Sequence, residues 1–181
     1  TVTSIENRSE ASIIQGIEEI IKVYRTAGYE ISTLISDNER GIISAVNHNE
    51  MPIGTKYMRV TANSHCHQVE NAIGIVKNRT RSTVLGLEYD LPERFYGDAI
   101  KHVVSSYNML INTDSKSTQS PYEKMFLEKP SYHIPYELKF GELALAKIPY
   151  SSNKSDMTVR GELVMVLGRS NEMTTTGPST L

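Results

Sequence analysis

The chain has 181 residues, of which 39% are hydrophobic and 22% are charged, and its formal net charge is −2 at pH 7. This length suffices for one sizeable hydrophobic core and a small appended module. The small net charge argues weakly against nucleic-acid binding, so any such binding has to rest on a local cluster of Lys and Arg such as the 56–81 segment.

Two further features bound the class of protein. The single cysteine, Cys66, excludes an internal disulfide and fits a reducing, intracellular compartment. No apolar run approaches the roughly 20 residues of a membrane-spanning helix, so we expect no membrane partner. The chain begins at Thr1 without an initiator methionine, which we interpret as the sign of a fragment or a processed segment.

The first elements predict an α/β unit. Residues 1–5 have the pattern of a short strand, and Ser9 has the side chain of an N-cap for a helix that Gly28 ends. The apolar residues of this helix recur at helical spacing: Ile13, Ile14, Ile17, Ile20, Ile21 and Tyr24. The alternation over 29–37 predicts a strand that ends at Asp37. Asp37 would then lie at the carboxyl end of a strand, where α/β sheets place ligands.

A short helix over 41–46, a loop and a short strand over 56–61 are expected next. A longer helix is predicted to begin between Cys66 and Gln68. Its apolar stripe consists of Val69, Ile73, Val76 and Thr80.

The polar residues of this longer helix are the candidate site. Glu70 and Lys77 are seven residues apart, which puts them on the same side of the helix two turns from each other. Arg79 and Arg81 continue the cationic stretch. This spacing predicts that a metal-binding acid and a phosphate-binding cation face the same groove.

The remainder of the chain is predicted to contain two more helices and a β element. A helix begins at Leu91 with Pro92 in its first turn, and its apolar residues are Phe95, Ala99, Val103, Tyr107 and Leu110. Residues 112–119 form a loop, and 120–123 match a capping box with proline at the first helical position. Two short apolar runs beyond Phe140 indicate a hairpin or part of a small β module, and we expect a flexible tail over 171–181.

Each candidate residue also has a simpler interpretation. Asp37 alone would be a helix cap or turn residue, and Glu70 a solvated helix residue. The three cations Lys77, Arg79 and Arg81 could form a solvated face, because charge runs usually do. The sequence His65-Cys66-His67 suggests zinc, but adjacent residues converge poorly on one tetrahedral ion, and no second ligand pair has the spacing of a zinc site.

The order of these elements, and their residues, resemble the integrases of copia-like retrotransposons. The catalytic core of that family has an RNase H-like fold and belongs to the DDE polynucleotidyl transferases. The matching pieces are I-S-D-N-E at 35–39, H-Q-V-E-N-A-I-G-I-V-K-N-R at 67–79, L-P-E-R-F at 91–95, Asn108 in S-Y-N, S-P-Y-E-K-M-F-L-E-K-P at 120–130 and L-K-F-G-E-L-A at 138–144. They occur in the family's order and cover roughly residues 1–145.

The resemblance implies Mg²⁺- or Mn²⁺-dependent joining of DNA ends. In this family three carboxylates hold two metal ions, and Asp37 matches the second carboxylate and Glu70 the third. Carboxylate oxygens suit Mg²⁺, and a pair of such ions about 4 Å apart activates the attacking hydroxyl and stabilises the leaving oxygen. The resemblance further implies retroelement ends and target DNA as partners, with Lys77, Arg79 and Arg81 on DNA, a homo-oligomeric intact protein, and a nuclear or virus-like-particle location.

The chain departs from the family in one decisive respect. No aspartate precedes Asp37, so the first catalytic carboxylate has no counterpart and the first strands are expected to lie upstream of Thr1. We therefore expect weak or no metal binding and no strand transfer by this polypeptide.

The resulting fold prediction is an α/β, RNase H-like integrase core that lacks its first strands and is followed by a small β element. Its expected parts are a core over 1–135, a β module over 136–170 and the tail over 171–181. Two alternatives remain open: a non-catalytic DNA-binding or protein-interaction module derived from a transposable element, and an α/β domain with no nucleic-acid role.

Overall fold

The computed structural model describes residues 1–36, 42–43, 55–60, 67–111, 117–130, 139–147 and 161–168. Within these ranges the protein is a mixed α/β structure with two small sheets. In chain order, the elements are α1 (Glu10–Thr26), β1 (Thr33–Ser36), β2 (Lys56–Arg59), α3 (His67–Leu85), the 3₁₀ helix η1 (Glu93–Phe95), α4 (Tyr96–Met109), α5 (Pro121–Phe126), β3 (Leu143–Lys147) and β4 (Gly161–Met165). Residues 42–43 are also helical.

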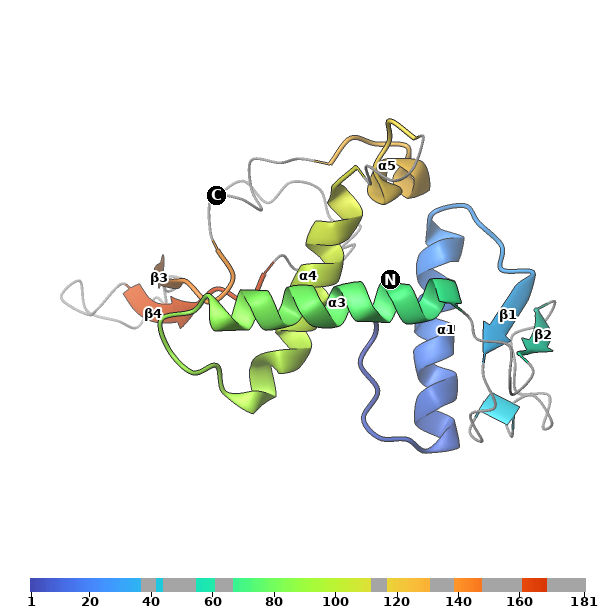
Figure 1. Cartoon of the computed structure of the whole chain (residues 1–181), viewed down its shortest axis with the longest axis horizontal. Helices are drawn as coiled ribbons and strands as arrows, with labels where there is room; N and C mark the ends of the chain where they lie inside the picture. Colours follow the sequence, from blue (N-terminus) through green and yellow to red (C-terminus); the bar gives the residue numbers. More distant parts are fainter. Residues whose placement is uncertain are drawn as a thin grey trace, which may run out of the picture.

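Helix α3 runs along the length of the molecule and α4 crosses it (Figure 1). These two form the most extensive contact between helices in the described part of the chain. The strands β1 and β2 lie at the end where α3 begins, and β3 and β4 lie at the end where it finishes. The structure therefore has two ends joined by one long helix.

At the first end, β1 and β2 pair in parallel with Thr33 opposite Lys56 and Ser36 opposite Arg59. The sequence predicted both strands, and the structure confirms them over a shorter length. The predicted strand over 1–5 is wrong, because these residues have no regular secondary structure. This segment instead packs beside α1 at Gly16. A Cβ added at Gly16 would lie 2.8 Å from the Ile5 side chain, so the absence of a side chain at Gly16 allows the close approach.

The caps of α1 match their predictions. The Ser9 hydroxyl accepts a hydrogen bond from the Ser12 amide at 3.3 Å, which satisfies one of the free amides of the first turn. Gly28 follows the helix with a φ of 84°, a left-handed conformation that glycine adopts without strain. Of the predicted apolar face only Ile21 is fully buried.

At the second end, the main core forms around α4. Its centre is Leu91, Ala99 and Phe140, and it is completed by Val84, Leu87, Tyr89, Phe95, Met165 and Leu167. The helix predicted from Leu91 begins as η1 and continues as α4. Ala99 and Val103 are buried as the apolar pattern requires, whereas Leu110 is exposed and Met109 takes the buried position.

The strands β3 and β4 form an antiparallel hairpin, with Leu145 opposite Leu163. Its base belongs to the core, since the Tyr89 hydroxyl donates to the Gly141 carbonyl oxygen at 2.7 Å. Gly141 has a φ of 80°, and a Cβ there would overlap Leu87, so glycine is required at this turn. The predicted division at 135 stays a prediction, although residues on both sides of it share one core.

The capping box of α5 is confirmed. The Ser120 hydroxyl accepts from the Glu123 amide at 3.1 Å, and the Glu123 carboxylate accepts from the Ser120 amide at 2.7 Å. The Tyr29 hydroxyl also donates to the Lys124 carbonyl oxygen at 2.8 Å, which ties the segment after α1 to α5. Residues 112–116 of the predicted loop and the predicted tail lie outside the described residues.

Candidate functional site

Helix α3 carries the described part of the candidate site. It begins at His67, within the predicted interval, and Glu70 lies in its first turn with an exposed side chain. A carboxylate in this position is favourable because the N-terminal end of a helix has a partial positive charge. Asp37, the other predicted metal ligand, lies outside the described residues, as do His65 and Cys66.

The structure brings Glu70 together with two of the three predicted cations. An α-helix turns about 100° per residue, so Lys77 and Arg81 both lie within roughly 20° of Glu70 around the axis of α3. Lys77 is about 10 Å farther along the axis and Arg81 about 6 Å beyond it. Glu70, Lys77 and Arg81, all exposed, are called the acid–base face below.

Arg79 does not belong to this face. It lies nine residues after Glu70, which is roughly 180° around the helix. Its guanidinium carbon lies 4.9 Å from the centroid of the Tyr107 ring on α4. The predicted cationic cluster is thus divided between two sides of α3, and counting helical turns along the sequence would have revealed the division.

The cations of the acid–base face are available to a ligand. In the described part of the chain, neither Lys77 nor Arg81 forms an ion pair with a carboxylate. Arg81 has only a 3.5 Å hydrogen bond to the Asn78 side-chain oxygen, which directs it along the helix surface. Two uncompensated cations one turn apart suit the spacing of negative charges on a nucleic-acid backbone.

The apolar stripe of α3 differs from its prediction in one half. Thr80 is buried, but Val69 and Ile73 are 50% and 47% exposed. In the second half of α3, Thr80 is buried and Val84 packs against the core. The acid therefore lies on the less packed half of the helix and the cations nearer the packed half.

Metal binding was tested against the donor groups of the described residues. Among them, no group of three or more His, Cys, Asp or Glu side chains is arranged to hold a metal ion. Mg²⁺ is usually held by one or two carboxylates together with substrate phosphates. Glu70 is the one predicted carboxylate ligand among the described residues, since Asp37 lies outside them.

A second site that sequence reasoning missed lies where α3 crosses α4. A cavity of about 320 Å³ opens there and is lined by Asn78, Arg79, Ser82, Thr83, His102, Val103 and Ser106. Burial lowers the pKa of His102 below its usual value. No motif in the sequence signals this group, since His102 and Ser106 meet the α3 residues only through the crossing of the two helices.

In the described ranges, no helix has both the length and the apolar character needed to cross a membrane. Comparison of the chain with protein-family models and with curated proteins finds no match.

Proposed function

We propose that this chain is a nucleic-acid-binding part of a retrotransposon integrase core with an RNase H-like fold. The acid–base face of α3 contacts the DNA backbone, and Asp37 and Glu70 are the remnants of a three-carboxylate metal site. This polypeptide binds DNA without joining its ends, because no aspartate precedes Asp37.

The observation that carries the proposal is the parallel pairing of β1 and β2 followed by α3. Parallel strands end at the same edge of a sheet, and β1 and β2 are in register with Ser36 opposite Arg59. Asp37 is the next residue after β1 in the sequence, and the chain leaves β2 towards the helix that carries Glu70. This order supports the convergence of the two carboxylates at one edge.

The charges of α3 support DNA as the partner. The net charge of the chain is −2, yet Lys77 and Arg81 form no ion pair with a carboxylate among the described residues. Contacts of this kind go to phosphates, so binding is expected to be independent of base sequence and to weaken steeply with salt. In the intact family the bound metal ions supply the activation of the attacking hydroxyl.

The binding of a fluorescent DNA duplex, measured between about 50 and 200 mM salt, tests the proposal. We expect the chain to bind DNA. The plot of log K against log salt has a negative slope, and the Lys77→Gln/Arg81→Gln double variant should make that slope shallower by about 1.8, because two phosphate contacts are lost. The matched control is Arg94→Gln on η1, which removes one cation away from α3. Absence of binding, or an unchanged slope in the double variant, would contradict the proposal.

An interaction module without catalysis is the second candidate. An aspartate on a strand encoded before Thr1 would favour the integrase core, and its absence from the full gene would favour this second candidate. The two candidates predict the same DNA binding and differ in what an added strand would do: joining of DNA ends by a chain extended with an aspartate-bearing strand supports the integrase core.

A further inference from the structure

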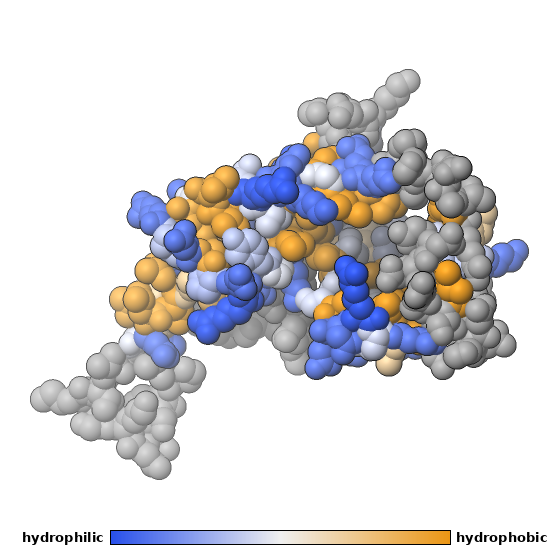
Figure 2. Space-filling view, turned by 60° about the horizontal axis from the view of Figure 1, so that its bottom comes forward, coloured by the Kyte–Doolittle hydropathy of each residue, from blue (hydrophilic) through white to orange (hydrophobic). Residues whose placement is uncertain are grey.

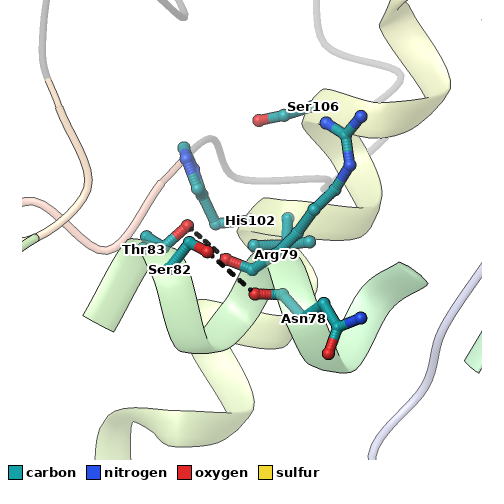
Figure 3. Close-up of a pocket in the computed structure, with 7 residues that line it drawn as sticks. Asn78, Arg79, Ser82, Thr83, His102 and Ser106 are labelled. Atoms are coloured by element: carbon teal, nitrogen blue, oxygen red, sulfur yellow. Dashed lines mark hydrogen bonds between the residues drawn. The ribbon is translucent and has the colours of Figure 1, made fainter. Parts of the chain in front are cut away.

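The cavity between α3 and α4 has a polar lining with one dominant charge (Figure 3). Four of its residues come from α3 and three from α4. In the close-up, the Arg79 side chain extends from α3 towards Ser106, and His102 and Ser106 lie one helical turn apart on α4. This group is called the crossing groove below.

Arg79 is held in place and its charge is not neutralised. Its guanidinium carbon lies 4.9 Å from the Tyr107 ring centroid, a stacking arrangement that restricts a long side chain. No carboxylate of the described residues forms an ion pair with it. A restricted, uncompensated guanidinium presents its fork of N–H donors to an anion at a reduced entropy cost.

The hydroxyl groups of the crossing groove have different roles. Ser82 donates to the Asn78 carbonyl oxygen at 3.1 Å and Thr83 to the Arg79 carbonyl oxygen at 2.9 Å, and Figure 3 marks both bonds. Their hydrogens are therefore used, and they offer lone pairs to a ligand. The Ser106 hydroxyl makes no such bond to a described residue, so it can donate.

The His102 ring is fixed by packing on its other side. It lies against Phe140 with ring centroids 5.2 Å apart. On Gly168, an added Cβ would lie 3.3 Å from the His102 Nδ1 atom, so this glycine is also close to the ring. Because burial lowers its pKa, the ring is largely neutral at pH 7 and has one N–H donor and one acceptor nitrogen. The groove thus combines donors at Arg79, Ser106 and His102 with acceptors at Ser82 and Thr83.

We propose that the crossing groove binds the phosphate ester of a nucleotide, with the phosphate on Arg79 and Ser106 and the sugar hydroxyl on Ser82 and Thr83. The donors suit a phosphate, and the acceptors suit a group that carries hydroxyl hydrogens, so an inorganic anion alone would use only half of the lining. The cavity volume of about 320 Å³ is large enough for more than the phosphate. The site is on the opposite side of α3 from Lys77 and Arg81, and the inference does not depend on the proposed function.

The test is a titration followed by amide NMR with thymidine 5′-monophosphate, thymidine and inorganic phosphate. We expect saturable shifts at residues 78–83 and 102–106 with the monophosphate, weaker binding of phosphate, and no binding of thymidine. Arg79→Gln should weaken monophosphate binding at least about tenfold, because a charge-assisted hydrogen bond is lost. Ser106→Asp, which adds a negative charge to the groove, should weaken it as well.

Arg94→Gln is the matched control, since Arg94 also stacks on an aromatic ring, that of Phe95 at 4.7 Å, but does not line the groove. It should bind the monophosphate as the unaltered chain does. Lys77→Gln/Arg81→Gln should also leave this binding unchanged, which separates the groove from the DNA surface. If Arg79→Gln fails to fold, Ser106→Asp gives the answer.

The source of the nucleotide is decided with a short oligonucleotide with and without a 5′-phosphate. Tighter binding of the phosphorylated form than of the monophosphate identifies a nucleic-acid end, and weaker binding identifies a free nucleotide. Spectra that do not change with the monophosphate would overturn the inference. The same monophosphate affinity in the Arg79→Gln and Ser106→Asp variants as in the unaltered chain would overturn it as well.

Discussion

At the end of the molecule where α3 finishes, Leu91, Ala99 and Phe140 are almost fully buried, whereas at the end where it begins, Ile35 and Met58 are 53% and 56% exposed. Both ends contain a two-stranded sheet, and among the described residues it is the β3–β4 sheet that contributes, through Met165, to the core with the helices. Parallel sheets normally have both faces covered, whereas antiparallel sheets often have one exposed face. Exposed apolar side chains are therefore more unusual on the parallel pair β1 and β2 than on the antiparallel pair β3 and β4. Among the described residues, most of the buried hydrophobic side chains therefore lie on or near α4.

The hairpin of β3 and β4 shows a smaller version of the same contrast. Its base packs in the core, but Leu143, Leu145 and Leu163 are exposed. Figure 2 shows apolar side chains gathered on the surface at this end of the molecule. Nothing in the described structure covers these three leucines, so the hairpin is buried at its base and exposed along its strands.

The largest effect is expected from Phe140→Ala. Phe140 is 5% exposed and packs with Leu91, Ala99 and the His102 ring, so its removal leaves a cavity and should cost about 3–5 kcal/mol of unfolding free energy. The measurement is urea unfolding followed by circular dichroism. Met58→Ala is the control at the other end and should change the free energy by less than a third of that amount. Equal losses in the two variants would show that the ends are equally packed.

A smaller effect is expected from Ser120→Ala at the start of α5. The variant removes the acceptor for the Glu123 amide, and loss of an N-cap typically costs about 1 kcal/mol. Because Tyr29 bonds to α5, hydrogen exchange of the Tyr29 amide should also rise. A loss of stability without faster exchange near Tyr29 would mean that the Tyr29–Lys124 hydrogen bond does not hold the segment after α1 in place.

The smallest effect is a shallow pH dependence from His102. Its pKa in the folded state is lowered by burial, while its unfolded value is about 6.5. The unfolded state therefore binds more protons in the window from 6.5 down to the folded pKa, and stability falls as pH decreases through that window. His102→Gln should flatten the dependence of the urea midpoint on pH below about 6.5. An unchanged slope in that variant would assign the dependence to other groups.

Local signals predicted the helices well. Ser9 and Gly28 bound α1, and Ser120 and Glu123 start α5, because each cap depends on residues a few positions apart. The apolar spacing of α3 predicted which side would be buried, but not that Val69 and Ile73 in its first half would stay half exposed. Coverage depends on which element packs there, and the sequence of one helix does not contain that information.

Long-range arrangement was less predictable. The sequence indicated strands at β1 and β2 but not their parallel pairing, which joins residues more than twenty positions apart. The division of Lys77 and Arg81 from Arg79 follows from helix geometry and could have been predicted. The crossing groove could not, because it exists only where α3 and α4 meet.

We propose that Asp37 and Glu70 share one edge of an RNase H-like sheet. The most direct measurement is cross-linking of an Asp37→Cys/Glu70→Cys chain in a Cys66→Ser background with a short thiol-reactive reagent, quantified by mass spectrometry. We expect rapid intramolecular cross-linking, and little with Asp37→Cys/Arg81→Cys, since Arg81 is about 16 Å farther along α3 than Glu70. No cross-linking in the Asp37→Cys/Glu70→Cys chain, or no more than in the Asp37→Cys/Arg81→Cys chain, would contradict the convergence of the two carboxylates and with it the integrase-core proposal.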